Sequence, residues 1–339
     1  MDIQPQIVTI FGGSGFVGKY ITQQMARAGW RVRVAVRRPQ EAIHVKTLGG
    51  VGQVEPIQAN IRDEESTRAA IAGADAVINC VGLLQESGAQ TFEALHVQGA
   101  ERIARLSAEA GIARLVHISA LGADPLADSV YASTKGKGEA AVLKAFPKAV
   151  ILRPSVIFGT EDNFFNRFAT LARYTLVIPV VGADSLLQPV YVDDVAAAAK
   201  TAVLDASAQG VYELGGPDKA SLRELLKYML EIIQRRRLIL NLPFFVGAMM
   251  GSIWDFAAKV SMGIFTNTIL TADQVKQLRH DNVVAEDART LADLGVVPTG
   301  MEAVLPEYLY AHRPYGQYAE ITASAQNLAG VRRIRSTAK

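Results

Sequence analysis

The chain has 339 residues, half of them hydrophobic and a fifth charged, which is ordinary for a globular protein with a sizeable core. Its formal net charge of +2 is too small to argue for a nucleic-acid partner. Cys80 is the one cysteine, which excludes a disulfide framework, and the five histidines lack the spacing of metal ligands, so we expect no metal site.

The first residues lack the basic and apolar regions of a signal peptide and are too few for a transit peptide. The longest apolar stretch, 242–254, is shorter than the roughly 20 residues that span a bilayer, and it contains Pro243. Either the chain acts where it is made or the sequence is a mature form, and in both cases we expect no membrane-spanning segment.

Strand and helix patterns alternate through the first half of the chain. Strands are predicted at 7–11, 31–36, 54–57, 76–81, 115–119 and 149–152, and helices at 19–28, after Asp63 and at 91–110. This alternation predicts an α/β fold of the Rossmann type, with a doubly wound parallel sheet.

The alternation of strand and helix patterns is less regular beyond Pro154. Helices are predicted at 163–174, at 195–204 and from a capping box at Ser221 and Glu224 to about residue 235, with short strands at 190–192 and 211–214. We expect a dinucleotide-binding domain of residues 1–159 and 190–215. A smaller, mainly helical C-terminal lobe would comprise 160–189 and 216–325, followed by a basic tail at 326–339.

A glycine-rich turn lies directly between the first strand and the first helix. Gly12 would allow the tight turn, Gly15 the approach of a pyrophosphate, and Gly18 the close packing of helix on strand. The free N–H groups and the positive dipole end of the helix favour phosphate there. The sequence therefore predicts a dinucleotide site that includes Gly12, Gly13, Ser14, Gly15, Phe16, Val17 and Gly18.

The end of the second strand indicates which dinucleotide is bound. NAD sites place a carboxylate there for the ribose 2′-hydroxyl, whereas this chain has Arg37 and Arg38 and no acid before Glu41. Arginine offers permanently charged, bidentate donors to a 2′-phosphate, which favours NADP(H). Two solvated arginines at a strand end are the alternative.

Several motifs follow the glycine turn in order: Asn60-Ile61-Arg62-Asp63, Asn79-Cys80-Val81-Gly82 and Tyr131-Ala132-Ser133-Thr134-Lys135. Together they resemble the extended or atypical short-chain dehydrogenase/reductase family over most of residues 7–215. The resemblance implies that Asn60 and Ile61 lie near the adenine and Val81 and Gly82 along the cofactor. It also implies that Pro154, Ser155, Val156 and Ile157 lie beside the nicotinamide.

Tyr131 and Lys135 are spaced so that both side chains lie on one helix face. The lysine charge is expected to lower the pKa of the tyrosine, which could then act as an acid or base. Ser119 is the candidate third partner, although a strand-end hydroxyl bonded to backbone is an equal alternative. His96 stands where family members often have Asn, and we expect it to be a structural hydrogen-bonding residue rather than a proton shuttle.

The distal half of the chain contains three further distinctive sequence motifs, at 153–159, 161–168 and 188–195. The order and the residues of these segments resemble those of the nucleotide-binding accessory subunits of respiratory complex I. That resemblance implies other complex I subunits as partners, a structural NADPH, and a peripheral place at the membrane. For a bacterial version this would be the cytoplasmic face of the inner membrane.

An apolar segment at 238–260, preceded by Arg235, Arg236 and Arg237, suits a membrane surface or a partner groove, with a lid over the cofactor cleft as the alternative. Two functions thus stay open. The first is a complex I accessory subunit that holds NADPH without turnover, which we favour. The second is a free NADP-dependent reductase or epimerase with Tyr131 as acid or base.

Overall fold

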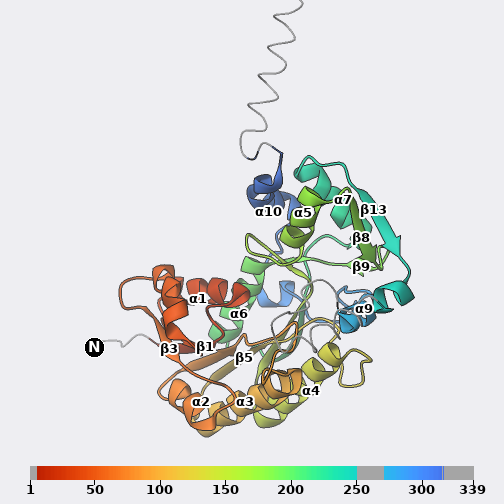
Figure 1. The fold of residues 1–339 in the computed structure, drawn as a ribbon. Helices are drawn as coiled ribbons and strands as arrows, with labels where there is room; N and C mark the ends of the chain where they lie inside the picture. The colour runs from red at the N-terminus through yellow and green to blue at the C-terminus, as the bar shows by residue number, and fades with distance from the viewer. Residues whose placement is uncertain (1–5, 250–270, 315, 317–339) are drawn as a thin grey trace, which may run out of the picture.

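The computed structural model describes residues 6–249, 271–314 and 316. Its centre is a seven-stranded parallel sheet with the order β11-β6-β5-β4-β1-β2-β3 (Figure 1). The strands are β1 (Ile7–Phe11), β2 (Arg31–Val36), β3 (Val54–Gln58), β4 (Ala76–Asn79), β5 (Arg114–Ile118), β6 (Val150–Pro154) and β11 (Gly210–Leu214). The prediction of a doubly wound parallel sheet is confirmed, since the strand order reverses beside β1.

Helices cover both faces of this sheet (Figure 1). One face carries α1 (Phe16–Arg27) and α6 (Val192–Leu204), and the other carries α2 (Glu64–Ile71), α3 (Ala100–Glu109) and α4 (Val130–Ala145). Short helical turns lie at η1 (Pro39–Leu48) and at η2 (Glu93–Gly99), a π-helical stretch that runs into α3. Because both faces are covered, the strands are buried on both sides and read as apolar runs.

Most predicted elements agree with the structure to within a few residues. Helix α1 begins at Phe16 rather than residue 19, because Gly15 already serves as its N-cap. The strand expected at 76–81 ends at Asn79, where the Asn79 side chain accepts a hydrogen bond from the Val81 amide and turns the chain.

The second lobe lies above the carboxyl edge of the sheet (Figure 1). Its helices are α5 (Phe165–Tyr174), α7 (Leu222–Ile232), α9 (Ala272–Gln277) and α10 (Met301–Leu309), with short turns η3 (Ala292–Leu294) and η4 (Tyr310–His312). Three two-stranded sheets join them: β7 (Ile157–Phe158) with β10 (Val190–Tyr191), β9 (Leu186–Leu187) with β12 (Ala220–Ser221), and β8 (Val177–Val181) with β13 (Leu238–Leu242). Four of these strands, β8, β9, β12 and β13, lie within the residues that we assigned to the mainly helical lobe.

Buried side chains form three cores. One packs α1 and α6 onto the sheet through Ile21 and Ala199, and one packs α2, α3 and α4 onto the opposite face. The third joins α5, α7 and α10 within the lobe through Phe165, Leu226 and Leu305. Within the described ranges, no helix has the length and apolar character needed to cross a membrane.

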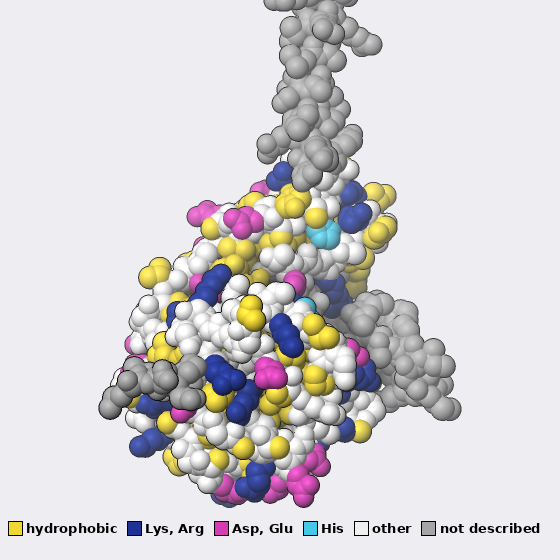
Figure 2. All heavy atoms as spheres, turned by 90° about the vertical axis from the view of Figure 1, so that its left-hand side faces the viewer, with side chains coloured by type: hydrophobic (Ala, Val, Ile, Leu, Met, Phe, Trp, Pro, Cys, Tyr) yellow, Lys and Arg dark blue, Asp and Glu magenta, His cyan; other side chains and the backbone are white. Residues whose placement is uncertain are grey.

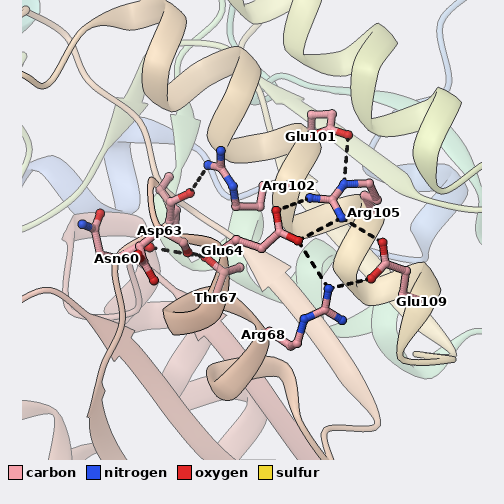
Figure 3. Close-up of polar contacts among 10 residues, drawn as sticks. Asn60, Asp63, Glu64, Thr67, Arg68, Glu101, Arg102, Arg105 and Glu109 are labelled. Carbon is pink, nitrogen blue, oxygen red and sulfur yellow. Dashed lines mark hydrogen bonds and ion pairs between the residues drawn. The ribbon is translucent and has the colours of Figure 1, made fainter.

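Helices α2 and α3 are also linked by an exposed ion-pair cluster, in which Arg105 reaches Glu64 and Glu109 at 2.8 Å each (Figure 3). Arg68 contacts the same two carboxylates, at 3.4 and 2.8 Å. The neighbouring Arg105 guanidinium lowers the pKa of the Glu64 carboxyl.

The capping box at the start of α7 provides a test of local stability. Ser221 accepts from the Glu224 amide and Glu224 accepts from the Ser221 amide, as the sequence predicted. Ser221→Ala should lower the free energy of unfolding by about 1 kcal/mol, because it leaves a helix N–H unpaired. Urea unfolding of Ser221→Ala measures this loss, with Glu224→Gln, which keeps the capping box, as the control variant. Equal stability of the two variants would contradict the prediction.

Candidate functional site

The glycine turn between β1 and α1 is a tightly packed feature. Gly12 has φ +76°, in the left-handed region that favours glycine. A Cβ at Gly18 would lie 2.2 Å from the Gly12 carbonyl oxygen, so no side chain fits there. Gly15 caps α1 without any side-chain hydrogen bond, which leaves the helix N-terminus available to an anion. These features form a cradle of the kind that a pyrophosphate requires.

Arg37 and Arg38 follow β2, the strand next to β1, and both are exposed. The Arg38 guanidinium lies 2.9 Å from the Glu41 carboxylate, and both side chains are more than two-thirds exposed. An exposed pair of this kind contributes at most about 1 kcal/mol, so an incoming phosphate can displace it.

The next predicted residues follow β3 and β4. Asn60 accepts from the Arg62 amide, while Ile61 is buried and fills the space that Gly99 leaves open. Gly82 lies beside the Lys135 ammonium, since a Cβ there would be 3.5 Å from Nζ. The sheet order therefore brings the glycine turn, the arginine pair and both motifs to one edge of the sheet.

Lys135 and Ser119 meet at the end of β5. Lys135 is 4% exposed, and its Nζ donates to the Ile118 carbonyl at 3.2 Å. Burial lowers the pKa of Lys135 to about 8. Ser119 is 5% exposed, and its Oγ has no hydrogen-bond partner within the described part of the chain. A buried hydroxyl without a partner is uncommon in folded proteins, and this one is available to a ligand.

Tyr131 behaves differently from our expectation. Its ring meets Phe92 and His96 edge-on, with centroids 6.0 and 5.5 Å away. Burial raises the pKa of Tyr131 to about 12, whereas we expected the Lys135 charge to lower it. The expected direction was wrong because the loss of solvent around the phenol, which disfavours its charged form, is the dominant effect there.

Two buried histidines, His96 and His117, lie near Tyr131 and Lys135, and the sequence analysis identified only His96. His96 Nε2 accepts from the Leu83 amide at 3.0 Å, and its Nδ1 lies 3.2 Å from Thr134 Oγ1. His117 Nδ1 lies 3.1 Å from the Asn79 amide nitrogen. Burial, followed by the Lys135 charge, lowers the pKa of each histidine to about 3. The expectation that His96 is a structural hydrogen-bonding residue is confirmed.

The structure adds a contact that the sequence did not predict. Asp273 on α9 accepts from Ser129 Oγ and from the Val130 and Tyr131 amides, at 2.8, 2.7 and 3.1 Å. It thereby caps the N-terminus of α4, the helix that carries Tyr131 and Lys135. The capping box at Thr271 and Gln274 is readable as a helix start, but nothing local signals the distant partner.

The segment from α9 to residue 289 continues along the same edge of the sheet. Ser155 lies directly after β6 and donates to Asn282, whose carbonyl also accepts from the Gln188 amide. Glu213 on β11 accepts from the Ala285 amide at 3.0 Å. We name residues 271–289 the strap. Val156 and Ile157 continue from Ser155 into β7 beneath it.

Comparisons with known proteins place this arrangement in a family. A model of the NAD dependent epimerase/dehydratase family matches residues 8–215, and the chain belongs to that family. The fold is shared with the NAD complex of UDP-glucose 4-epimerase from Thermus thermophilus, at 17% identity and a TM-score of 0.64 over 91% of this chain and 99% of that one.

Two curated relatives are similar to nearly the whole chain. One is "NADH dehydrogenase [ubiquinone] 1 alpha subcomplex subunit 9, mitochondrial" of Arabidopsis thaliana, 36% identical over 91% of this chain and 79% of the relative. The other is "NADH-ubiquinone oxidoreductase 40 kDa subunit, mitochondrial" of Neurospora crassa, 29% identical over 91% of this chain and 80% of the relative. Within the described residues, no group of three potential ligands could hold a metal ion.

The buried histidines predict how stability depends on pH. The unfolded state binds protons on His96 and His117 near pH 6.5, but the folded state binds them only near pH 3. Stability is therefore complete above pH 6.5 and lost as the pH falls toward 3, by about 2 kcal/mol per histidine between pH 8 and 5. Urea unfolding across this range, with imidazole chemical shifts, tests this; a folded-state titration near pH 6 would contradict it.

Proposed function

We propose that this protein is an accessory subunit of respiratory complex I that holds NADPH as a structural cofactor. The similarity to subunits of NADH–ubiquinone oxidoreductase carries the proposal, because it extends over 91% of the chain and about four-fifths of each relative. The fold alone would not suffice, since it also serves an epimerase. In this role the protein stabilises the peripheral arm of the complex and aids its assembly.

The glycine cradle and the residues along the sheet edge are the proposed cofactor site. Gly12, Gly13, Ser14, Gly15, Phe16, Val17 and Gly18 would hold the pyrophosphate, and Arg37 and Arg38 the 2′-phosphate of NADP(H). The adenine would lie by Asn60 and Ile61, and the rest of the cofactor by Val81, Gly82 and residues 154–157. Ser119 supports this assignment, because its buried Oγ has no hydrogen-bond partner among the described residues and Lys135 donates to the carbonyl of the preceding Ile118.

Tyr131, Lys135 and Ser119 would hold the nicotinamide ribose rather than turn over a substrate. A bound nicotinamide supplies a hydride donor or acceptor, but proton exchange by Tyr131 is hindered near neutral pH because burial raises its pKa to about 12. The strap also occupies the α4 N-terminus beside Tyr131. A bound cofactor stabilises the folded state whether or not it reacts.

The proposed contact with the membrane and with partner subunits lies in 238–260, of which the structure describes 238–249. Here Leu238, Phe245 and Met249 are more than half exposed. Residues 250–260, with Trp254 and Phe256, and the basic tail at 326–339 lie outside the described residues. In a bacterium this surface would face the cytoplasmic side of the inner membrane. The domain boundaries given above are part of the same proposal.

The two arginines after β2 test the identity of the cofactor. Arg37→Ala with Arg38→Ala should weaken NADPH binding by roughly tenfold to a hundredfold, because charged hydrogen bonds to the 2′-phosphate are lost. NADH, which lacks that phosphate, should change by less than about threefold. The paired change to Ala of Arg27, at the end of α1, and Arg31, at the start of β2, controls for net charge. Equal losses for both nucleotides would overturn the assignment to NADP(H).

Native purification tests the subunit role. Detergent extraction of membranes should yield the chain together with other complex I subunits, and denaturation should release NADPH. A chain recovered as a soluble monomer and absent from the extracted complex would refute the proposal. Tyr131→Phe addresses the alternative enzyme: assembly and respiration should be unchanged, whereas loss of turnover on a substrate would favour a free reductase or epimerase.

A further inference from the structure

A hollow of about 550 Å³ lies at the C-terminal end of α7, far in sequence from the dinucleotide site. Its lining is dominated by cations: Lys227, Arg235, Arg236 and Arg237, with Glu231 as the one acid. Three of these cations are consecutive in the chain and connect α7 to β13. The hollow therefore combines a concave shape with a strong excess of positive charge.

Acidic side chains balance these cations only in part, since Glu231 lines the same hollow and Glu224 lies within electrostatic range of Lys227. None of the four forms an ion pair with a carboxylate inside the described ranges, whereas Arg105 contacts three carboxylates between α2 and α3 (Figure 3). Figure 2 shows that basic and acidic side chains are interspersed over the lower, sheet-bearing part of the molecule. Burial and the charges of Arg237 and Arg173 lower the pKa of Arg235, which is a sign of uncompensated repulsion.

Two of the arginines are nevertheless held in place. Arg235 Nε donates to the His312 carbonyl at 2.9 Å, and Arg237 Nε donates to the Ala172 carbonyl at 2.8 Å. Both side chains are half-buried, while Arg236 and Lys227 are exposed. Arg237 Nη1 also donates to the Arg236 carbonyl at 2.8 Å. Guanidinium groups anchored in this way lose little entropy when they bind a ligand, and their remaining terminal N–H groups can donate to it.

The backbone before the arginines is unusual as well. Gln234 has φ +53° and is the one non-glycine residue with positive φ in the described part of the chain. A conformation of this kind costs free energy and tends to persist at functional positions. Here it turns the chain sharply at the end of α7, so that the three arginines that follow line the hollow.

We infer that this hollow binds a phosphate-bearing anion, through the terminal N–H groups of Arg235 and Arg237 together with Arg236 and Lys227. Planar guanidinium groups match phosphate oxygens bidentately, and the lysine adds a point charge. Leu238 and Leu240 follow directly and are 63% and 45% exposed, so the anion could be free or be the headgroup of a lipid whose chains meet this apolar strand. This inference goes beyond the proposed cofactor site and does not depend on it.

The test uses the full chain and two probes. Inorganic pyrophosphate, measured by calorimetry, represents a free anion, and vesicles of phosphatidylcholine with or without phosphatidic acid, measured by flotation, represent a headgroup. The variant Arg236→Gln with Lys227→Gln removes two exposed cations and leaves the anchored arginines in place. Lys144→Gln with Lys148→Gln removes two exposed cations near the end of α4 and is the matched control.

The hollow variant should lose about tenfold or more in affinity for at least one probe, and the control should lose less than about twofold. Loss for pyrophosphate alone identifies a free anion, and loss for phosphatidic acid vesicles alone identifies a headgroup. Pyrophosphate binding at the glycine cradle would be the same in both variants, which distinguishes it from binding in the hollow. Equal losses in the two variants, or no binding of either probe to the unmodified chain, would overturn the inference.

Discussion

The close approach of α1 to the turn after β1 is the constraint on which the site depends. With no room for a Cβ between Gly18 and the Gly12 carbonyl, the helix axis passes directly above the strand end. The N–H groups at the N-terminus of α1 therefore face the carboxyl edge of the sheet, where β1, β2 and β4 end. A larger residue at position 18 would displace α1 from α6 and from the core that both helices share with the sheet.

The strap gives the same edge a second boundary. Polar contacts from Asp273, Asn282 and Ala285 reach α4, the residue after β6, and β11, so one segment closes over the ends of several elements. The strap therefore places the lobe in direct contact with the helix that carries Tyr131 and Lys135.

The pKa values of the buried groups near the end of β5 are set mainly by the loss of solvent. Lys135, His96 and His117 share a poorly solvated region, and each has its pKa shifted toward the neutral form. At the exposed end of α7, Arg235, Arg236 and Arg237 gather, and within the described residues none of the three forms an ion pair with a carboxylate. Burial thus disfavours charge in this region, whereas the lobe carries a cluster of basic side chains beside the exposed apolar strand β13.

The sequence by itself determined the parallel sheet, the glycine cradle and the helix starts at Asp63 and Ser221, because local periodicity, glycine and capping residues set them over a few positions. It also identified Lys135 and Ser119 as neighbours of one strand end. Tertiary structure decided the rest. The pKa of Tyr131 rises because the phenol is buried, and Asp273 reaches α4 across more than 140 residues. No local pattern encodes such contacts, since they form only when separate elements pack.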